Sequence, residues 1–342
     1  MSPIRNSTKV RIMVKNNGIL IVGAVFLCTV FILSLMLGTK YVPVDTVYES
    51  LFAFDRTEAV QQIVRDIRLP RSIAAALIGS FLALSGCIMQ VLTRNPIAEP
   101  ALLGVSHGAA FALVLTLAFF PTISNAGTMA ASIVGAGISV FLVFGLALYA
   151  KGGRNPVKLA LAGMALGMFL SSLTSAVGMS FNVAKDMSFW YAGGLSTIEW
   201  SSVKLLVMGG AAGLALTVLI ARSLNVIHLG EDVAEGLGVS VHRVRALGVI
   251  SVLLMTGSSV AVSGTIGFIG LVVPHICRMM VGHDHRYLLP ASALFGGGLL
   301  VFADMAAKLV NPPYETPVGV VTALVGVPFF LYLVRKGRGA SL

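Results

Sequence analysis

The feature that most constrains this chain is a series of apolar segments, each about 20 residues long, which recurs through all 342 residues. Only 11% of the residues are charged, against about 25% in a soluble domain. Lipid offers backbone polar groups no partners, and segments without strict alternation cross it as helices. We predict an all-α, polytopic membrane bundle, a single domain over residues 1–342. Its ten or so spans are roughly 18–38, 72–93, 101–120, 127–150, 157–181, 202–221, 246–263, 266–281, 288–310 and 316–334.

Lysine and arginine are distributed unequally between the two sides of this arrangement. An even number of spans places both termini on one side, and that side holds 16 of the 24 Lys and Arg residues. Cytoplasmic loops carry such an excess in membrane proteins, so we predict cytoplasmic termini. The net charge of +10 has the same origin and does not indicate nucleic-acid binding. Five of the eight external exceptions lie between Lys40 and Arg71.

Two of these exceptions, Arg68 and Arg71, stand in "IRLPRSIAAALIG", at the external start of the second predicted span. Pro70 suits the first turn of a helix. A cation there meets the positive end of the helix dipole, which disfavours it by about 0.3–1 kcal/mol. Two interpretations stay open. The arginines snorkel to lipid phosphates or pair with Asp66, or they form a positive patch for an acidic partner.

The sequence lacks the signatures of common catalytic sites. It contains no G-x-x-x-x-G-K-[ST] phosphate loop and no H-E-x-x-H. We therefore expect no enzyme, and no ATP hydrolysis on this chain. The three cysteines lie far apart in apolar surroundings and the six histidines have no matching ligand set, so we predict no metal site. His275, His283 and His285 are assigned to helix capping or loop solvation.

Asp304 is the one carboxylate clearly inside a predicted span. An intramembrane carboxylate is a functional candidate by default, and a proton-coupled transporter would use one. Lys308 follows four residues later, which supports a structural ion pair or an interhelical hydrogen bond at least as well. Both interpretations stay open.

Two stretches resemble each other, "FLALSGCIMQVLTRNPIAEP" from Phe81 and "SVAVSGTIGFIGLVVPHICRMM" from Ser259. Each reaches A-[LV]-S-G and then a region that contains proline. On the predicted topology the first helix runs inward and the second outward. Opposite senses predict an inverted repeat, an arrangement that places a transport pathway between the halves.

The segment 225–245, "NVIHLGEDVAEGLGVSVHRVR", is predicted to lie outside the membrane. Acids follow Gly230 and glycines close the segment, which are the start and stop signals of a short helix. Helices that lie on a bilayer favour Lys and Arg on the polar face. An acidic helix with apolar residues is better explained by contact with a cytoplasmic protein.

Together these segments resemble one family, the ten-span permease subunits of ATP-binding-cassette importers (type II) for iron–siderophores, haem and cobalamin. The resemblance covers nearly the whole chain. It rests on "RLPRSIAAALIGSFLALSGCIMQ", "RNPIAEPALLGVSHGA", "LALAGMALG", "LGEDVAEGLGV", "SGTIGFIGLVVPHICRMMVGHDHRYLLP" and "ETPVGVVTALVGVPFF", in family order. It implies the permease of an iron–siderophore importer. The alternatives are a haem or cobalamin permease and, from another class, an ion-coupled secondary transporter.

The resemblance also implies site residues. In this family an external substrate-binding protein docks with acidic residues on basic residues of the permease, which here are Arg68, Arg71 and Lys308. Segment 39–71 is then the external loop and the start of the second span. Segment 225–245 is the coupling-helix loop that contacts the ATPase, through Gly230, Glu231, Ala234, Leu237 and Gly238. The pathway candidates in the fifth span are Ser171, Ser172, Thr174 and Ser175.

The implied partners are ATP-binding-cassette ATPase subunits, a second permease chain in a heterodimer or homodimer, the external binding protein and membrane lipid. ATP and Mg²⁺ belong to the ATPase, so we expect no cofactor on this chain. The implied location is the bacterial cytoplasmic membrane.

Overall fold

The computed structural model describes residues 3–38, 40–149, 156–311 and 314–338, and within them it contains helices and turns but no strand. The elements are α1 (Pro3–Met36), α2 (Val44–Phe52), α3 (Ala59–Gln62), the π-helical turn η1 (Ile63–Arg68), α4 (Leu69–Leu92), the 3₁₀ turn η2 (Pro100–Leu103), α5 (Val105–Phe119), α6 (Asn125–Tyr149), α7 (Pro156–Ser180), α8 (Ala184–Ala192), α9 (Trp200–Ile227), α10 (Glu231–Gly236), α11 (Val241–Ser263), α12 (Ile269–Val281), α13 (His285–Val310) and α14 (Val318–Arg338).

A helix occupies each of the ten predicted spans. Within the described residues, seven helices are long and apolar enough to cross a membrane: Met13–Met36, Ala59–Leu92, Asn125–Val143, Leu161–Ser180, Trp200–Ile227, Val241–Ser263 and His285–Val310. The helices of the other three segments, α5, α12 and α14, are apolar but shorter. The all-α membrane bundle is confirmed.

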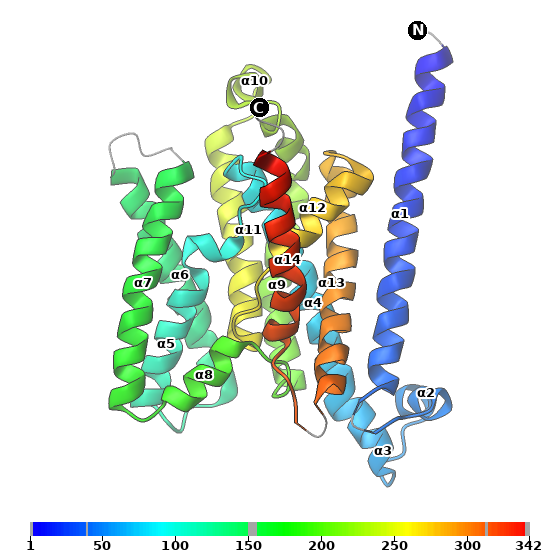
Figure 1. Cartoon of the computed structure of the whole chain (residues 1–342), viewed down its shortest axis with the longest axis vertical. Helices are drawn as coiled ribbons and strands as arrows, with labels where there is room; N and C mark the ends of the chain where they lie inside the picture. Colours follow the sequence, from blue (N-terminus) through cyan, green and yellow to red (C-terminus); the bar gives the residue numbers. More distant parts are fainter. Residues whose placement is uncertain (1–2, 39, 150–155, 312–313, 339–342) are drawn as a thin grey trace.

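The bundle has two distinct ends (Figure 1). The start of α1, the short helix α10 and the end of α14 lie at one end, and α2 and α3 lie at the other. We call these the α10 end and the α2 end. The predicted docking segment, 39–71, and the predicted coupling segment, 225–245, therefore lie at opposite ends of the molecule.

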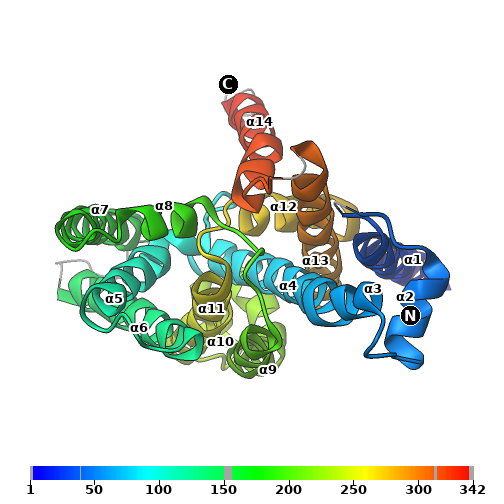
Figure 2. The ribbon, with the colours of Figure 1, turned by 90° about the horizontal axis from the view of Figure 1, so that it is seen from below.

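Helix α4 forms the centre of the bundle. It packs against α13, α11, α12 and α9, and most of its residues are buried (Figure 2). Glycines allow this close packing, because small residues let helix backbones approach. A Cβ at Gly86 would lie 1.8 Å from the carbonyl oxygen of Gly270 on α12, and one at Gly79 would lie 2.2 Å from that of Gly296 on α13.

The α-helix α4 begins at Leu69 with Pro70 in its first turn, as predicted, but the chain is already helical before it. Helical structure runs without interruption from Ala59 to Leu92, so Arg68 and Arg71 lie inside a long helix. Proline lacks an N–H group and its ring collides with the preceding turn of an α-helix. The wider turn η1 immediately precedes Leu69 and Pro70 and accommodates the ring.

Helices α4 and α11 run in opposite directions through the bundle and pack side by side (Figure 1). This agrees with the opposite senses expected of the two similar stretches, while the inverted repeat itself stays a prediction. The segment 264–268 after α11 is irregular, and its backbone is held by protein: the Phe268 N–H donates to Glu99 Oε1 over 2.8 Å. Irregular backbone at membrane depth needs such partners.

Candidate functional site

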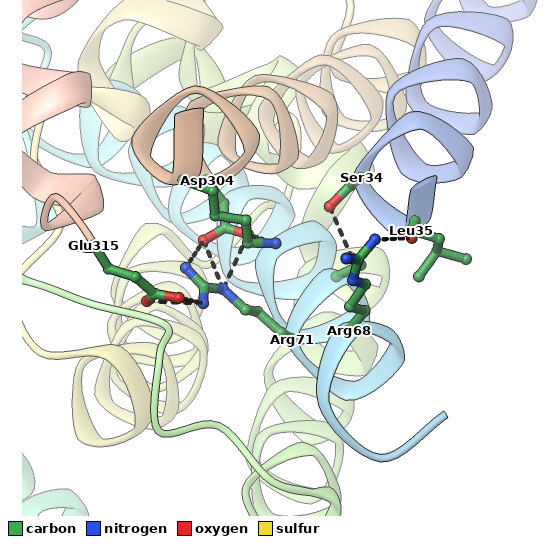
Figure 3. A network of polar contacts seen from close by, with 8 residues as sticks. Ser34, Leu35, Arg68, Arg71, Asp304 and Glu315 are labelled. Carbon is green, nitrogen blue, oxygen red and sulfur yellow. Dashed lines mark hydrogen bonds and ion pairs between the residues drawn. The ribbon is translucent and has the colours of Figure 1, made fainter. Parts of the chain in front are cut away.

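The first candidate site is a buried ion cluster at the α2 end, centred on Arg71 (Figure 3). Arg71 Nη2 lies 2.8 Å from Asp304 Oδ1, and Arg71 Nε donates to the same oxygen over 2.9 Å. Arg71 Nη1 donates to both carboxylate oxygens of Glu315, over 2.8 and 2.9 Å. One guanidinium thereby joins α4, α13 and the segment that precedes α14.

Lys308 completes this cluster from the next turn of α13. Its Nζ lies 2.7 Å from Asp304 Oδ2, so Asp304, with no exposed surface, faces two cations. The structural ion pair considered for Asp304 and Lys308 is confirmed. The four side chains carry two positive and two negative charges, and this balance makes burial of the cluster tolerable.

Arg68 points away from that cluster, toward the end of α1 (Figure 3). Its Nη1 donates to the carbonyl oxygens of Leu35 and Met36 over 2.7 and 2.9 Å, and its Nη2 donates to the Lys40 carbonyl. The last carbonyls of a helix lack partners within it and carry partial negative charge. Arg68 therefore caps α1, an intramolecular role that the sequence analysis did not find.

The three predicted docking residues are all buried, with exposed fractions of 8% for Arg68, 5% for Arg71 and 7% for Lys308. Their charges are satisfied within the chain, and docking through them stays a prediction. The exposed basic side chains of segment 40–71 and of the neighbouring α8 and α9 are different ones: Lys40, Arg56, Arg65, Lys185 and Lys204. Exposed carboxylates such as Asp55 and Asp66 are interspersed with them.

A cavity of about 600 Å³ opens beside the ion cluster. Arg71 and Glu315 line it, together with Asp186, Trp190 and the irregular segment 194–197. The cluster is thus buried in protein yet borders a space that begins near the α2 end. This position could be found only from the folded chain, because α4, α8 and α14 are distant in sequence.

The second candidate site is α10, at the opposite end. The predicted start and stop signals are confirmed: α10 begins at Glu231 after Gly230 and ends at Gly236. Gly230 and Gly238 have φ angles of +123° and +79°, in the region that favours glycine. Ala234 is fully buried against the bundle, whereas Leu237 is 66% exposed.

Exposed apolar side chains surround this helix. Leu229, Val233 and Leu237 are all exposed at this end of the molecule. Glu231 is instead held from the bundle side, with its Oε1 2.6 Å from Arg245 Nη2 and 3.1 Å from Arg94 Nη2. A rigidly held short helix with an apolar outer face is a suitable docking element. Sequence reasoning missed Arg94, which follows α4 in the chain.

The predicted pathway residues occupy different faces of α7. Ser172 and Ser175 are exposed, Ser171 is half-buried and Thr174 is buried. Ser172 and Thr174 donate to carbonyls one turn earlier in α7, Met168 and Leu170. The four residues therefore do not form one polar surface within this chain.

Helix α14 projects from the rest of the bundle (Figure 2) and packs along α12, α13 and α8. A depression of about 640 Å³ lies between α14, α8 and segment 264–268, and its lining includes Tyr191, Thr265, Gly319 and Leu324. Large apolar side chains of α7 and α14 are exposed, including Met168 at 74% and Leu324 at 71%. These helices present an uncovered apolar face to lipid or to another membrane subunit.

Comparison with known proteins decides the family. The profile of the FecCD transport family matches residues 26–336. The chain belongs to the FecCD transport family. It is 49% identical over 320 residues to the iron(3+)-hydroxamate import system permease protein FhuB of Bacillus subtilis, covering 94% of this chain and 83% of that protein.

A second relative of this FecCD chain is the iron-uptake system permease protein FeuB of Bacillus subtilis, 39% identical over 94% of the chain and 96% of FeuB. A solved structure described as an inward-facing ABC transporter of the metal-chelate type superimposes with a TM-score of 0.82. It is 29% identical and matches over 94% of this chain and 99% of its own. The fold and the role of a multi-pass transport permease follow from these similarities.

Proposed function

We propose that this chain is the permease subunit of an ATP-driven importer that moves an iron–siderophore complex across a bacterial cytoplasmic membrane. The observation that carries the proposal is the similarity to the Bacillus iron(3+)-hydroxamate permease, which extends over nearly the whole chain. The permease does no covalent chemistry. A separate ATPase binds ATP and Mg²⁺, and differential binding of ATP to two states drives the change of conformation.

The α10 end is cytoplasmic in this proposal, with both termini on that side. The exposed apolar face of α10 supports contact with the ATPase, with Leu237 inserted into a groove of the partner. Gly230 and Gly238 fix the ends of the helix, Ala234 anchors it, and Glu231 ties it to Arg94 and Arg245. A displacement of α10 is thereby transmitted through Arg94 to the end of α4 and through Arg245 to the start of α11.

The α2 end is external and receives the substrate-binding protein. Burial of Arg68, Arg71 and Lys308 favours a division of roles, in which exposed basic residues make the first contact and the ion cluster lies beneath them. Trp200 Nε1 donates to the Arg65 carbonyl over 3.2 Å, so the first turn of α9, with Lys204 one turn further on, lies beside η1.

A second permease chain, identical or different, covers the exposed apolar face of α7 and α14. The substrate pathway then runs between the two chains, where Ser172 and Ser175 are exposed. Asp304, bound to two cations, gives no support to proton or ion coupling.

The proposal is tested by uptake of radiolabelled ferric hydroxamate into proteoliposomes that hold the purified complex, with and without ATP. Leu237→Glu should leave ATP hydrolysis in place and abolish uptake, because charge in an apolar contact prevents docking. Ser240→Glu, at an exposed polar position after α10, is the matched control. Uptake that proceeds without any ATPase would refute the proposal.

Docking is tested separately by the affinity of the loaded binding protein for the complex. The double variant Arg65→Glu with Lys204→Glu should weaken binding of the loaded binding protein. It should leave the free energy of unfolding unchanged, since both side chains are exposed. Unchanged affinity in this variant would place the contact elsewhere on the α2 end.

A further inference from the structure

A cavity of about 350 Å³ lies at the α10 end, where α4, α9 and α12 end and α13 begins. Its polar lining combines one amide, two arginines and three histidines from four parts of the chain: Gln90, Arg94, His228, Arg278, His283 and His285. No carboxylate belongs to the lining. The cavity is separate from the exposed face of α10 and from the ion cluster at the α2 end.

Arg278 supplies a charge without an acidic partner. This half-buried side chain donates from Nη2 to Gln90 Oε1 over 2.6 Å. Among the residues that the structure describes, no carboxylate lies within ion-pair distance of it. A guanidinium that is partly removed from water and paired only with a neutral amide retains donors for an anion.

His285 supplies a buried nitrogen that lacks a partner. The residue is 2% exposed, so its predicted assignment to loop solvation is wrong. Its backbone N–H donates to Asn225 Oδ1, and its Nδ1 lies 2.7 Å from the same oxygen. Asn225 therefore holds the proton on Nδ1. Nε2 is left buried with no hydrogen-bond partner, a costly state unless something fills the cavity.

The rim of the cavity carries two more histidines. The rings of His228 and His283 are stacked with centroids 5.0 Å apart, and both residues are exposed. Three histidines could suggest a metal, yet the described residues contain no group of three or more His, Cys, Asp or Glu placed to hold one. Arg278 and Arg94 would also repel a cation.

We propose that this cavity binds a phosphate-type oxyanion, with Arg278 and the rim histidines donating to its oxygens. The oxyanion meets His285 Nε2 through a proton, carried either by the imidazole as imidazolium or by a hydroxyl of the phosphate. Two sources offer this chemistry at the level of the helix ends, inorganic phosphate in solution and the headgroup of an anionic lipid. The binding site itself does not depend on the transport proposal.

Arg94 connects the cavity to α10. It lines the cavity and also pairs with Glu231 at 3.1 Å, so a bound anion competes with Glu231 for its guanidinium. Occupancy of the cavity therefore loosens one of the two ion pairs that hold α10. Arg245 keeps the other.

A simpler account assigns the cations to the helix ends alone, because the carbonyl ends of α4, α9 and α12 attract positive charge. The two accounts are separated by ligand binding to the full chain, purified in a neutral detergent. Inorganic phosphate is titrated against chloride at matched ionic strength. In parallel, phosphatidylcholine nanodiscs with and without phosphatidylglycerol are examined by native mass spectrometry for retained lipid.

The variants are Arg278→Gln and, as a control, Arg286→Gln, an exposed arginine on α13 outside the cavity lining. We expect Arg278→Gln to weaken binding by about tenfold or more and Arg286→Gln to leave it within about twofold. His228→Gln, an exposed rim change, gives a second weakened variant if Arg278→Gln does not fold.

If inorganic phosphate binds saturably and the variants change its affinity as expected, the ligand is the free anion. If Arg278→Gln selectively loses retained phosphatidylglycerol, the ligand is the lipid. The proposal would be overturned if neither phosphate nor phosphatidylglycerol bound, or if Arg278→Gln and Arg286→Gln had equal effects. Binding of Zn²⁺ that needs His285 but not Arg278 would overturn it as well. Because no step involves ATP or uptake, the result stands apart from the test of transport.

Discussion

Breaking the ion cluster at the α2 end gives the sharpest prediction. In Asp304→Asn, Arg71 and Lys308 keep their charges but share only Glu315, which pairs with Arg71 and is 40% exposed in its side chain. Removing one partner of a buried pair leaves an uncompensated charge and costs about 3–5 kcal/mol. We therefore expect the free energy of unfolding to fall by about that amount.

A second change should restore most of this loss. Asp304→Asn with Lys308→Met leaves Arg71 and Glu315 as a matched pair. Replacing a buried ion pair by uncharged groups of similar volume often leaves the stability unchanged. The double variant should lie within about 1 kcal/mol of the parent protein. The two changes are then strongly non-additive, as expected of residues in direct contact.

The measurement is unfolding in mixed micelles, followed by the fluorescence of the two tryptophans. Trp190 lines the cavity beside Arg71 and Trp200 lies near η1, so both report on this end of the bundle. Glu49→Gln, an exposed carboxylate on α2, is the control. A loss below about 1 kcal/mol in Asp304→Asn, or a double variant as unstable as the sum of the singles, would refute the reasoning.

Three further predictions concern local features. Arg68→Met should lower the free energy of unfolding by about 2–4 kcal/mol, since it removes the charged donor from the end of α1; the exposed Arg56→Met should not, and equal losses would contradict the cap. Gly86→Ala should lower thermal stability, at a cost of about 1–3 kcal/mol, because its Cβ meets a carbonyl of α12; Gly18→Ala, in open space, should be neutral, and two equally stable variants would argue against the contact. Partial loss of hydration at the cavity rim, and then the neighbouring His283 and Arg278, lower the pKa of His228. The folded protein should therefore lose stability as the pH falls through the ordinary histidine range. A pKa for His228 at or above that range, measured in the folded protein by nuclear magnetic resonance, would contradict this.

The elements that sequence predicted well are those set by local patterns. The ten spans follow from the length of apolar segments, and α10 follows from acids after Gly230 and glycines at its end. The helices α2 and α3 were missed, because segment 40–62 is too short and too polar to show a span. The continuous helix before Pro70 was missed since the π-helical turn has no sequence signal.

The contacts of the charged residues could not be predicted in the same way. Arg71 and Asp304 are 233 residues apart, and nothing local distinguishes a buried arginine from one at a docking surface. The spacing of Arg68 and Arg71 suggested one positive face, yet their side chains reach opposite neighbours, α1 and α13. The Asp304–Lys308 pair was accessible, because four residues is the spacing of neighbours on a helix.

The same ion cluster has a consequence for how the protein is made. Ribosomes produce α4 long before α13, so Arg71 enters the membrane while its partner Asp304 has yet to be synthesised. During that interval the arginine can only reach toward the water at the surface, as long basic side chains do. Asp304 and Lys308, by contrast, enter together on one helix and neutralise each other as they insert. Lateral assembly of α4 into the bundle is thus completed late, when α13 arrives, and a chain truncated before α13 would expose an unpaired charge to membrane quality control.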